Sequence, residues 1–311
     1  MSKKMLIAID VDNEQLETLK AVGDVEITIK NQNTLEPADV ADKNIIVGNI
    51  APKLLKDCKA LEFLQLNSAG FDNYVGVLDP KIKLCTAVGS FSPAVGEHML
   101  AMTFSLIRHF PEYRDKQNAK DWSDCGKIIS VEKSTIAVLG LGDIGSSYAQ
   151  KVKALGAKKV IGVRRNLKKK PAYVDELYTL ADLDKVLPQC DIVAMVLPSS
   201  KETVNLINKK TLAMMKKGAY LINVGRGDAI NQDDLLEALR SGQLGGAACD
   251  VMTPEPLPKD NPLWEQKNFL LTPHVGGWFF LKETVDRIVN IAARNVYAYL
   301  HDGELINVAE H

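Results

Sequence analysis

A glycine-rich segment, Gly140-Leu-Gly142-Asp-Ile-Gly145, constrains the fold more than any other feature of the chain. An apolar run at 134–139 precedes it, and a helical pattern at 144–155 follows it and stops at Gly156. Glycines in this frame allow a tight strand-to-helix turn and let backbone N–H groups at the helix start approach a pyrophosphate. The glycine pattern alone is a weak signal, but its frame predicts a dinucleotide-binding α/β domain.

Three polar residues, Arg226, Glu255 and His274, each follow an apolar, strand-like run farther along the chain; these runs lie at 220–224, 247–251 and 269–271. In an open parallel sheet the carboxyl ends of the strands line one crevice, where ligands bind. A guanidinium, a carboxylate and an imidazole beside a dinucleotide suit proton-coupled hydride transfer to a carbonyl. Taken singly, each residue is equally well explained as part of a turn or a solvated loop. The ordered set favours an enzyme.

The first hundred residues carry a smaller α/β pattern of their own. Strand-like runs alternate with a helical pattern at 14–20, and they lie at 5–9, 25–29, 44–47, 62–66 and 82–85. A long helix is predicted from Ser92, which can cap it, with Pro93 in its first turn. A further helix is predicted at 283–300, and we expect it to cross back and complete the first domain.

The length of 311 residues favours two domains over one compact core. We place a substrate domain at 1–95 and 281–311, and a dinucleotide-binding domain at 96–280. The net charge of -1 gives no reason to expect nucleic acid or an anionic membrane as a partner. No apolar run approaches the roughly 20 residues of a membrane span, and the first residues resemble a strand more than a signal peptide.

The cysteines, Cys58, Cys85, Cys125, Cys190 and Cys249, are odd in number and lack the spacing of a metal site. We therefore expect reduced thiols, a cytoplasmic protein and no metal. Cys249 lies in an apolar strand, where a core thiol is favoured over a nucleophile.

The cofactor is indicated by the residues that end the next strand, 159–163. An acidic residue there binds the ribose of NAD, whereas NADP sites often place arginine at this point. The chain has Arg164-Arg165-Asn166 and no acid. A guanidinium can pair with a 2′-phosphate that a carboxylate would repel. The pattern favours NADP, with NAD as the alternative and a solvated basic turn as the simpler reading.

Nearly the whole chain resembles the D-isomer-specific 2-hydroxyacid dehydrogenases. Besides the glycine loop, five blocks carry the resemblance: Asn67-Ser-Ala-Gly-Phe-Asp72, Ala94-Val-Gly-Glu-His98, Asn223-Val-Gly-Arg-Gly227, Asp250-Val-Met-Thr-Pro-Glu-Pro-Leu257 and Thr272-Pro-His-Val-Gly-Gly277. The resemblance implies two doubly wound parallel-sheet domains, a Rossmann cofactor domain and a discontinuous flavodoxin-like substrate domain. It also implies an active-site cleft between them, a homodimer, and reduction of a 2-keto acid to a D-2-hydroxy acid.

Matching positions then imply roles. His274 is expected to be the general acid, Glu255 its partner, and Arg226 the group that binds the substrate carboxylate and polarises its carbonyl. Backbone N–H groups of Ser68, Ala69 and Gly70 are expected to hold the other carboxylate oxygen, and Asp250 the nicotinamide carboxamide. The expected cofactor contacts are Gly140, Gly142, Asp143, Ile144, Gly145, Arg164, Arg165, Asn166, Leu197, Pro198, Thr203, Val224, Gly225, Arg226, Asp250, His274 and Gly276.

Alternatives remain open at this point. A formate dehydrogenase would have glutamine in place of Glu255. A cofactor-sensing protein, like the transcriptional corepressors of this superfamily, would bind the dinucleotide without turnover. For His98 on the long helix, packing is favoured over a ligand role. Four aromatic residues are expected to line a substrate pocket, form a dimer contact or fill the core: Trp122, Trp278, Phe279 and Phe280.

Overall fold

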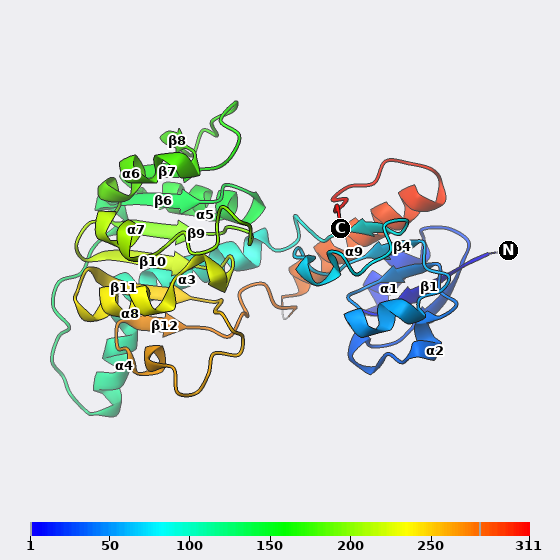
Figure 1. Ribbon diagram of the computed structural model, residues 1–311, viewed down its shortest axis with the longest axis horizontal. Helices are drawn as coiled ribbons and strands as arrows, with labels where there is room; N and C mark the ends of the chain where they lie inside the picture. Colours follow the sequence, from blue (N-terminus) through cyan, green and yellow to red (C-terminus); the bar gives the residue numbers. More distant parts are fainter. Residues whose placement is uncertain (1, 280) are drawn as a thin grey trace. The chain divides into compact units, whose positions relative to one another are not determined.

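The computed structural model describes residues 2–279 and 281–311. It divides the chain into two compact units, Met1–Phe91 with Phe279–His311, and Ser92–Trp278 (Figure 1). The sequence-based boundaries at 95/96 and 280/281 lie a few residues from these limits. Phe280, one of the four aromatic residues considered above, lies outside the described residues.

The first unit contains a parallel sheet in the strand order β2-β1-β3-β4-β5. Its strands are β1 Lys3–Ile7, β2 Val25–Ile29, β3 Ile45–Val47, β4 Phe63–Gln65 and β5 Lys83–Cys85; its helices are α1 Asn13–Lys20, α2 Pro37–Val40 and α9 Lys282–Leu300; and its 3₁₀ turns are Gln32–Thr34, Pro52–Asp57 and Asp72–Tyr74. Helix α1 begins at a capping box in which the Asp12 carboxylate accepts the N–H of Gln15. Helix α9 is tied to β4 by buried Asn295, whose Nδ2 donates to Gln65 Oε1 at 2.8 Å.

The second unit contains a seven-stranded parallel sheet in the order β12-β11-β10-β9-β6-β7-β8. Its strands are β6 Thr135–Leu139, β7 Lys159–Val163, β8 Glu176–Tyr178, β9 Ile192–Met195, β10 Ala219–Asn223, β11 Leu244–Cys249 and β12 Phe269–Leu271. Its helices are α3 Ser92–Ile107, α4 Phe110–Asn118, α5 Asp143–Ala154, α6 Leu183–Val186, α7 Lys209–Met214 and α8 Gln232–Arg240, and its 3₁₀ turns are Val131–Lys133, Leu180–Asp182, Leu187–Gln189, Gly227–Ala229 and Pro262–Glu265. The strand order reverses between β6 and β9, which is where ligands bind in doubly wound sheets.

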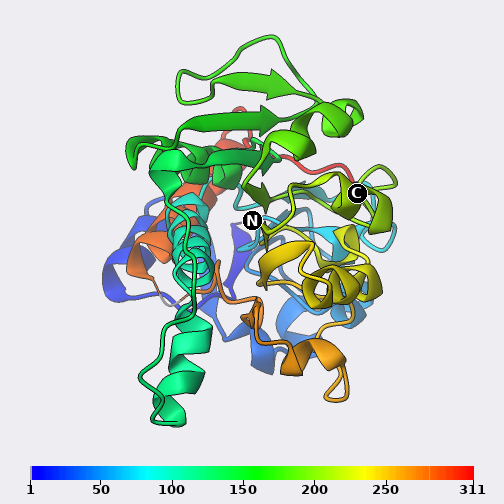
Figure 2. The ribbon, with the colours of Figure 1, turned by 90° about the vertical axis from the view of Figure 1, so that its left-hand side faces the viewer.

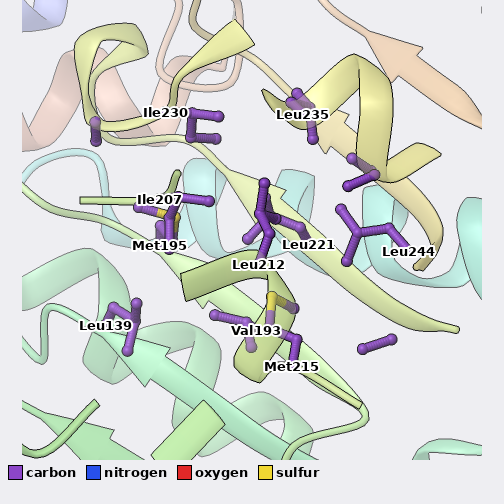
Figure 3. Close-up of a cluster of buried hydrophobic side chains, with 14 of the residues drawn as sticks. Leu139, Val193, Met195, Ile207, Leu212, Met215, Leu221, Ile230, Leu235 and Leu244 are labelled. Carbon is purple, nitrogen blue, oxygen red and sulfur yellow. The ribbon is translucent and has the colours of Figure 1, made fainter. Parts of the chain in front are cut away.

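Both faces of the second sheet are covered (Figure 2). Helices α3 and α5 pack on one face, and α6, α7 and α8 lie on the other. The interior is apolar: Figure 3 shows Val193, Met195 and Leu221 of the sheet in one cluster with Leu212 and Leu235 of these helices. Continuous apolar strands of this kind require cover on both sides. The expected fold of two doubly wound parallel-sheet domains is confirmed.

One segment of the second unit has little cover. Helix α4 and the chain after it extend away from the sheet (Figure 2), and Phe110, Tyr113 and Trp122 are 59%, 38% and 102% exposed. A core-filling role for Trp122 is therefore wrong, because its side chain is fully accessible. Among the described residues, no helix is both long and apolar enough to cross a bilayer.

Candidate active site

The glycine loop joins β6 to α5 at the point where the strand order reverses. Gly140 has φ +99, and a Cβ atom there would lie 2.4 Å from the carbonyl oxygen of Val196. A Cβ atom on Gly145 would lie 1.9 Å from the Gly140 oxygen, so neither position accepts a side chain. Gly142, the N-cap of α5, faces open space within 4 Å. This open cradle at the start of a twelve-residue helix fits a pyrophosphate.

The two arginines after β7 differ in what they contact. Arg164 is half-buried, and its Nη2 donates to the carbonyl oxygen of Lys169. The side-chain oxygen of Asn166 accepts the N–H of Lys168 at 2.9 Å and so shapes the same turn. Arg165 is exposed, and its guanidinium contacts no acceptor in the part of the chain that the structure describes. Arg165 is therefore the arginine that is available to a ligand.

The remaining expected cofactor positions form the floor beside this loop. Leu197 and Val224 are buried, and a Cβ atom on Gly225 would lie 2.6 Å from the backbone nitrogen of Leu197. The hydroxyl of Thr203 is already used, because it donates to the carbonyl oxygen of Pro198 at 2.6 Å. Thr203 therefore shapes the 197–203 loop from within.

Arg226 lies between two glycines that the fold requires. Besides the close approach at Gly225, a Cβ atom on Gly227 would lie 2.1 Å from the backbone carbon of Met252. The side chain of Asn223, itself buried, accepts the N–H of Gly225 and donates to the carbonyl oxygen of Arg226. Arg226 is thus presented half-exposed from a fixed turn after β10, and a free surface turn does not describe it.

His274 and Glu255 form a direct pair. His274 Nδ1 lies 2.9 Å from Glu255 Oε2, and the side chains are 53% and 40% exposed. The other carboxylate oxygen of Glu255 accepts the N–H of Met252 at 2.9 Å. Met252 also packs against Gly227, so the loop that carries Arg226 adjoins the loop that carries Glu255. With Nδ1 engaged by Glu255, Nε2 is the ring nitrogen that remains for another partner.

Asp250, which follows β11, is buried, and both of its carboxylate oxygens accept hydrogen bonds. Its carboxylate accepts the hydroxyl of Thr272 at 2.5 Å and the N–H groups of Val275 and Gly276 at 2.9 Å each, and His98 Nε2 lies 3.5 Å away. Burial by itself raises the pKa of this carboxyl, but the hydrogen bonds from His98, Thr272 and the two N–H groups outweigh burial and lower it below the usual value. Asp250 is therefore an ionised anchor for the loop that carries His274.

Sequence reasoning missed His98, Thr272 and Asn223 as parts of this site. All three lie inside blocks that carry the family resemblance, and the side chain of each makes a hydrogen bond that orders the loops of the site. A block shared with a family signals that a residue matters, but it does not say which atoms the residue contacts.

Ser68, Ala69 and Gly70 lie in the first unit, after β4, whereas the other candidates lie in the second. Their backbone N–H groups bond to no acceptor within residues 2–279 and 281–311. The Ser68 hydroxyl donates to the carbonyl oxygen of Gly70 at 2.7 Å and closes this turn. Of the two described aromatic residues at 278–279, Trp278 is 46% exposed, and Phe279 packs edge-on against Phe91.

The thiols take no part in this site. All five cysteines are free, and Cys249 is buried, which raises its pKa to about 12. The expected core thiol at Cys249 is confirmed.

Comparison with known proteins adds the following. A family model for the NAD-binding domain of D-isomer specific 2-hydroxyacid dehydrogenases matches residues 100–276. A D-3-phosphoglycerate dehydrogenase from Synechocystis is 31% identical over 93% of this chain, which spans 52% of that protein. A hydroxypyruvate reductase from Blautia hydrogenotrophica is 28% identical over 94% of this chain and 87% of its own length. The crystal structure of a D-isomer specific 2-hydroxyacid dehydrogenase family protein from Aeromonas salmonicida is 31% identical, covers 100% of this chain and 99% of its own, and has a TM-score of 0.88.

Proposed function

Because this chain belongs to the D-isomer-specific 2-hydroxyacid dehydrogenase family, a family of NAD(P)-dependent oxidoreductases, we propose that it reduces a 2-keto acid to the D-2-hydroxy acid with NADPH. The observation that carries this proposal is the pair formed by His274 Nδ1 and Glu255 Oε2, 2.9 Å apart. The pair lies at the same sheet edge as the glycine loop and Arg226. An acid, its carboxylate partner and a carboxylate-binding cation are what this reaction requires.

Each residue has a step in the reaction. Arg226 binds the substrate carboxylate and polarises the carbonyl, and the N–H groups of Ser68, Ala69 and Gly70 take the other carboxylate oxygen. When bound, the dinucleotide supplies a hydride to the carbonyl carbon. The protonated His274 gives the Nε2 proton to the carbonyl oxygen, which becomes the hydroxyl of the product. Glu255 keeps the ring oriented and stabilises its positive charge.

The cofactor proposal rests on Arg165. An exposed guanidinium without a partner in the described structure, at the end of β7, suits the 2′-phosphate of NADP. The glycine cradle at Gly142 and the N–H groups of the first turn of α5 hold the pyrophosphate, and Asp250 remains a candidate contact of the carboxamide. NAD is the alternative cofactor.

Two wider properties complete the proposal. The free cysteines fit a reducing, cytoplasmic setting. The exposed aromatic residues of the 110–122 segment fit a homodimer, because a second copy of the chain would cover them.

The testing experiment measures initial rates of NADPH and NADH oxidation against a series of 2-keto acids, from glyoxylate to phenylpyruvate. NADPH-linked turnover with at least one acid is the expected result. Turnover with NADH alone would retain the enzyme class and overturn the cofactor proposal. Tight dinucleotide binding without turnover would overturn the reaction and favour a corepressor-like sensor.

A further inference from the structure

A chain of hydrogen bonds runs from His98 on α3 to the loop that carries His274. His98 Nε2 lies 3.0 Å from Thr272 Oγ1, and Thr272 Oγ1 lies 2.5 Å from Asp250 Oδ1. Asp250 in turn accepts the N–H groups of Val275 and Gly276. The side chains of Asp250 and His98 are 3% and 22% exposed, so most of this series of hydrogen bonds is shielded from water.

The direction of these hydrogen bonds follows from the number of hydrogens. The Thr272 hydroxyl has one hydrogen, and it donates that hydrogen to the ionised Asp250 carboxylate. Thr272 Oγ1 can therefore only accept from His98, so His98 Nε2 must carry a hydrogen. His98 is thus a donor that orients the Thr272 hydroxyl toward Asp250.

The loop held by this chain needs such support. His274 has φ +54, a left-handed conformation that is unfavourable for a residue with a side chain and persists only where the surroundings enforce it. Asp250 binds three successive N–H groups of this loop: its backbone oxygen accepts the N–H of His274 at 2.7 Å, and its carboxylate accepts the N–H groups of Val275 and Gly276. Gly276 packs directly on the ring of His98, since a Cβ atom on Gly276 would lie 2.9 Å from His98 Cδ2.

We propose that His98 is a positioning residue of the reaction. Through Thr272 and Asp250 it holds residues 272–276 in the backbone conformation that directs His274 toward Glu255. The inference rests on the proposed function for its kinetic consequence, whereas the anchoring of the loop can be measured without it. A misplacement of about 1 Å can cost on the order of 100-fold in rate.

The test compares His98→Leu, which removes the donor, with His98→Gln, whose amide nitrogen can replace Nε2. The matched control is Ala101→Gln, three residues later on the same helix and exposed. For His98→Leu we expect kcat to fall about 10- to 100-fold, with a much smaller change in KM. His98→Gln should recover most of the rate, and Ala101→Gln should match the unaltered protein. In a His274→Asn background, His98→Leu should produce little further loss, because its effect passes through His274.

Amide hydrogen exchange separates this inference from the proposed function. In His98→Leu, the amides of Val275 and Gly276 should exchange faster while the strands of the second unit stay protected, and His98→Gln should restore protection. Unchanged exchange at these amides would overturn the positioning role even where the unaltered protein turns over normally. Faster exchange in a protein that reduces none of the 2-keto acids would instead support the anchor and contradict the proposed reaction. An equal loss of kcat with and without His274 would also overturn the inference, since it would show that His98 acts elsewhere.

Discussion

At the scale of single residues, the pair of Glu255 and His274 leads to a direct prediction. His274→Asn removes the proposed proton donor, and we expect reduction to fall about 100- to 10,000-fold, the usual contribution of general acid catalysis. Glu255→Gln keeps a hydrogen-bond acceptor but removes the negative charge, so a smaller fall is expected. The measurement is kcat for NADPH oxidation with the best 2-keto acid. Glu265→Gln, an exposed site away from the loop, is the control. Near-normal reduction by His274→Asn would mean that another group is the acid.

Arg165 carries the cofactor proposal at the same scale. A hydrogen bond to a charged group contributes roughly 1.5–3 kcal/mol, so Arg165→Ala should weaken NADPH binding by about 10- to 150-fold and leave NADH binding almost unchanged. Dissociation constants for both nucleotides can be measured by fluorescence titration. Arg240→Ala, an exposed arginine at the end of α8, removes the same charge elsewhere and should change neither constant. An unaltered ratio of the two constants in Arg165→Ala would contradict the role of this arginine.

At the scale of elements, two glycines of the β6–α5 loop are expected to have different roles: Gly145 in the stability of the turn and Gly142 in cofactor binding. Gly145→Ala places a Cβ atom against the Gly140 oxygen, so the turn between β6 and α5 must distort. We expect a lower melting temperature, since backbone shifts of this kind cost about 1–3 kcal/mol. Gly142→Ala meets no atom within 4 Å and should leave the melting temperature nearly unchanged, but its methyl group would obstruct a pyrophosphate on α5. Cofactor titration together with thermal unfolding distinguishes the two. Normal cofactor affinity in a stable Gly142→Ala would place the pyrophosphate elsewhere.

The bounds of the strands show how much of the fold could be predicted from the sequence. Strands β2, β7 and β12 run over the residues expected from their apolar patterns, because those patterns report burial directly. Strand β11 begins at Leu244, three residues before the expected Ala247. The prediction started too late because Gly245 and Gly246 have a low strand propensity. A Cβ atom on Gly245 would lie 2.6 Å from the Gly218 oxygen, so the backbones of neighbouring strands meet closely there. Such packing is tertiary and leaves no periodic signal.

The hydrogen bonds of the site were hidden for a similar reason. His98 meets Thr272 across 174 positions of the chain, and Thr272 meets Asp250 across 22. The glycine frame and the order of Arg226, Glu255 and His274 are local patterns, so they could be recognised in advance. Which hydroxyl orients which carboxylate depends on how α3 packs on the sheet, and that packing appears only in the folded chain.

At the scale of the whole molecule, Asp250 links stability to pH. Its folded pKa is lowered, so the carboxylate contributes stability that is fully present above its unfolded pKa, near 3.9, and is lost as pH falls through the folded value. The melting temperature should therefore be flat near neutral pH and fall in acid. Asp250→Asn should lower the melting temperature at pH 7 and flatten this acid dependence. Thermal unfolding between pH 3 and 7 tests both. If the melting temperature of Asp250→Asn falls with pH as steeply as that of the unaltered protein, other carboxylates dominate the acid transition.

The proposed homodimer is expected to form through the exposed aromatic residues of the 110–122 segment. Trp122 is 102% exposed and Phe110 59%, and exposed aromatic side chains of this kind are suited to an interface with a second copy of the chain. If a second copy covers it, Phe110→Ser with Trp122→Ser should shift the protein from dimer to monomer in sedimentation equilibrium. The secondary structure should stay intact, because neither side chain belongs to the core. Val204→Ser, another exposed apolar site on the second unit, serves as the control and should remain dimeric. A dimer that survives both serines with unchanged affinity would place the contact on a different surface, and a monomeric unaltered protein would refute the dimer itself.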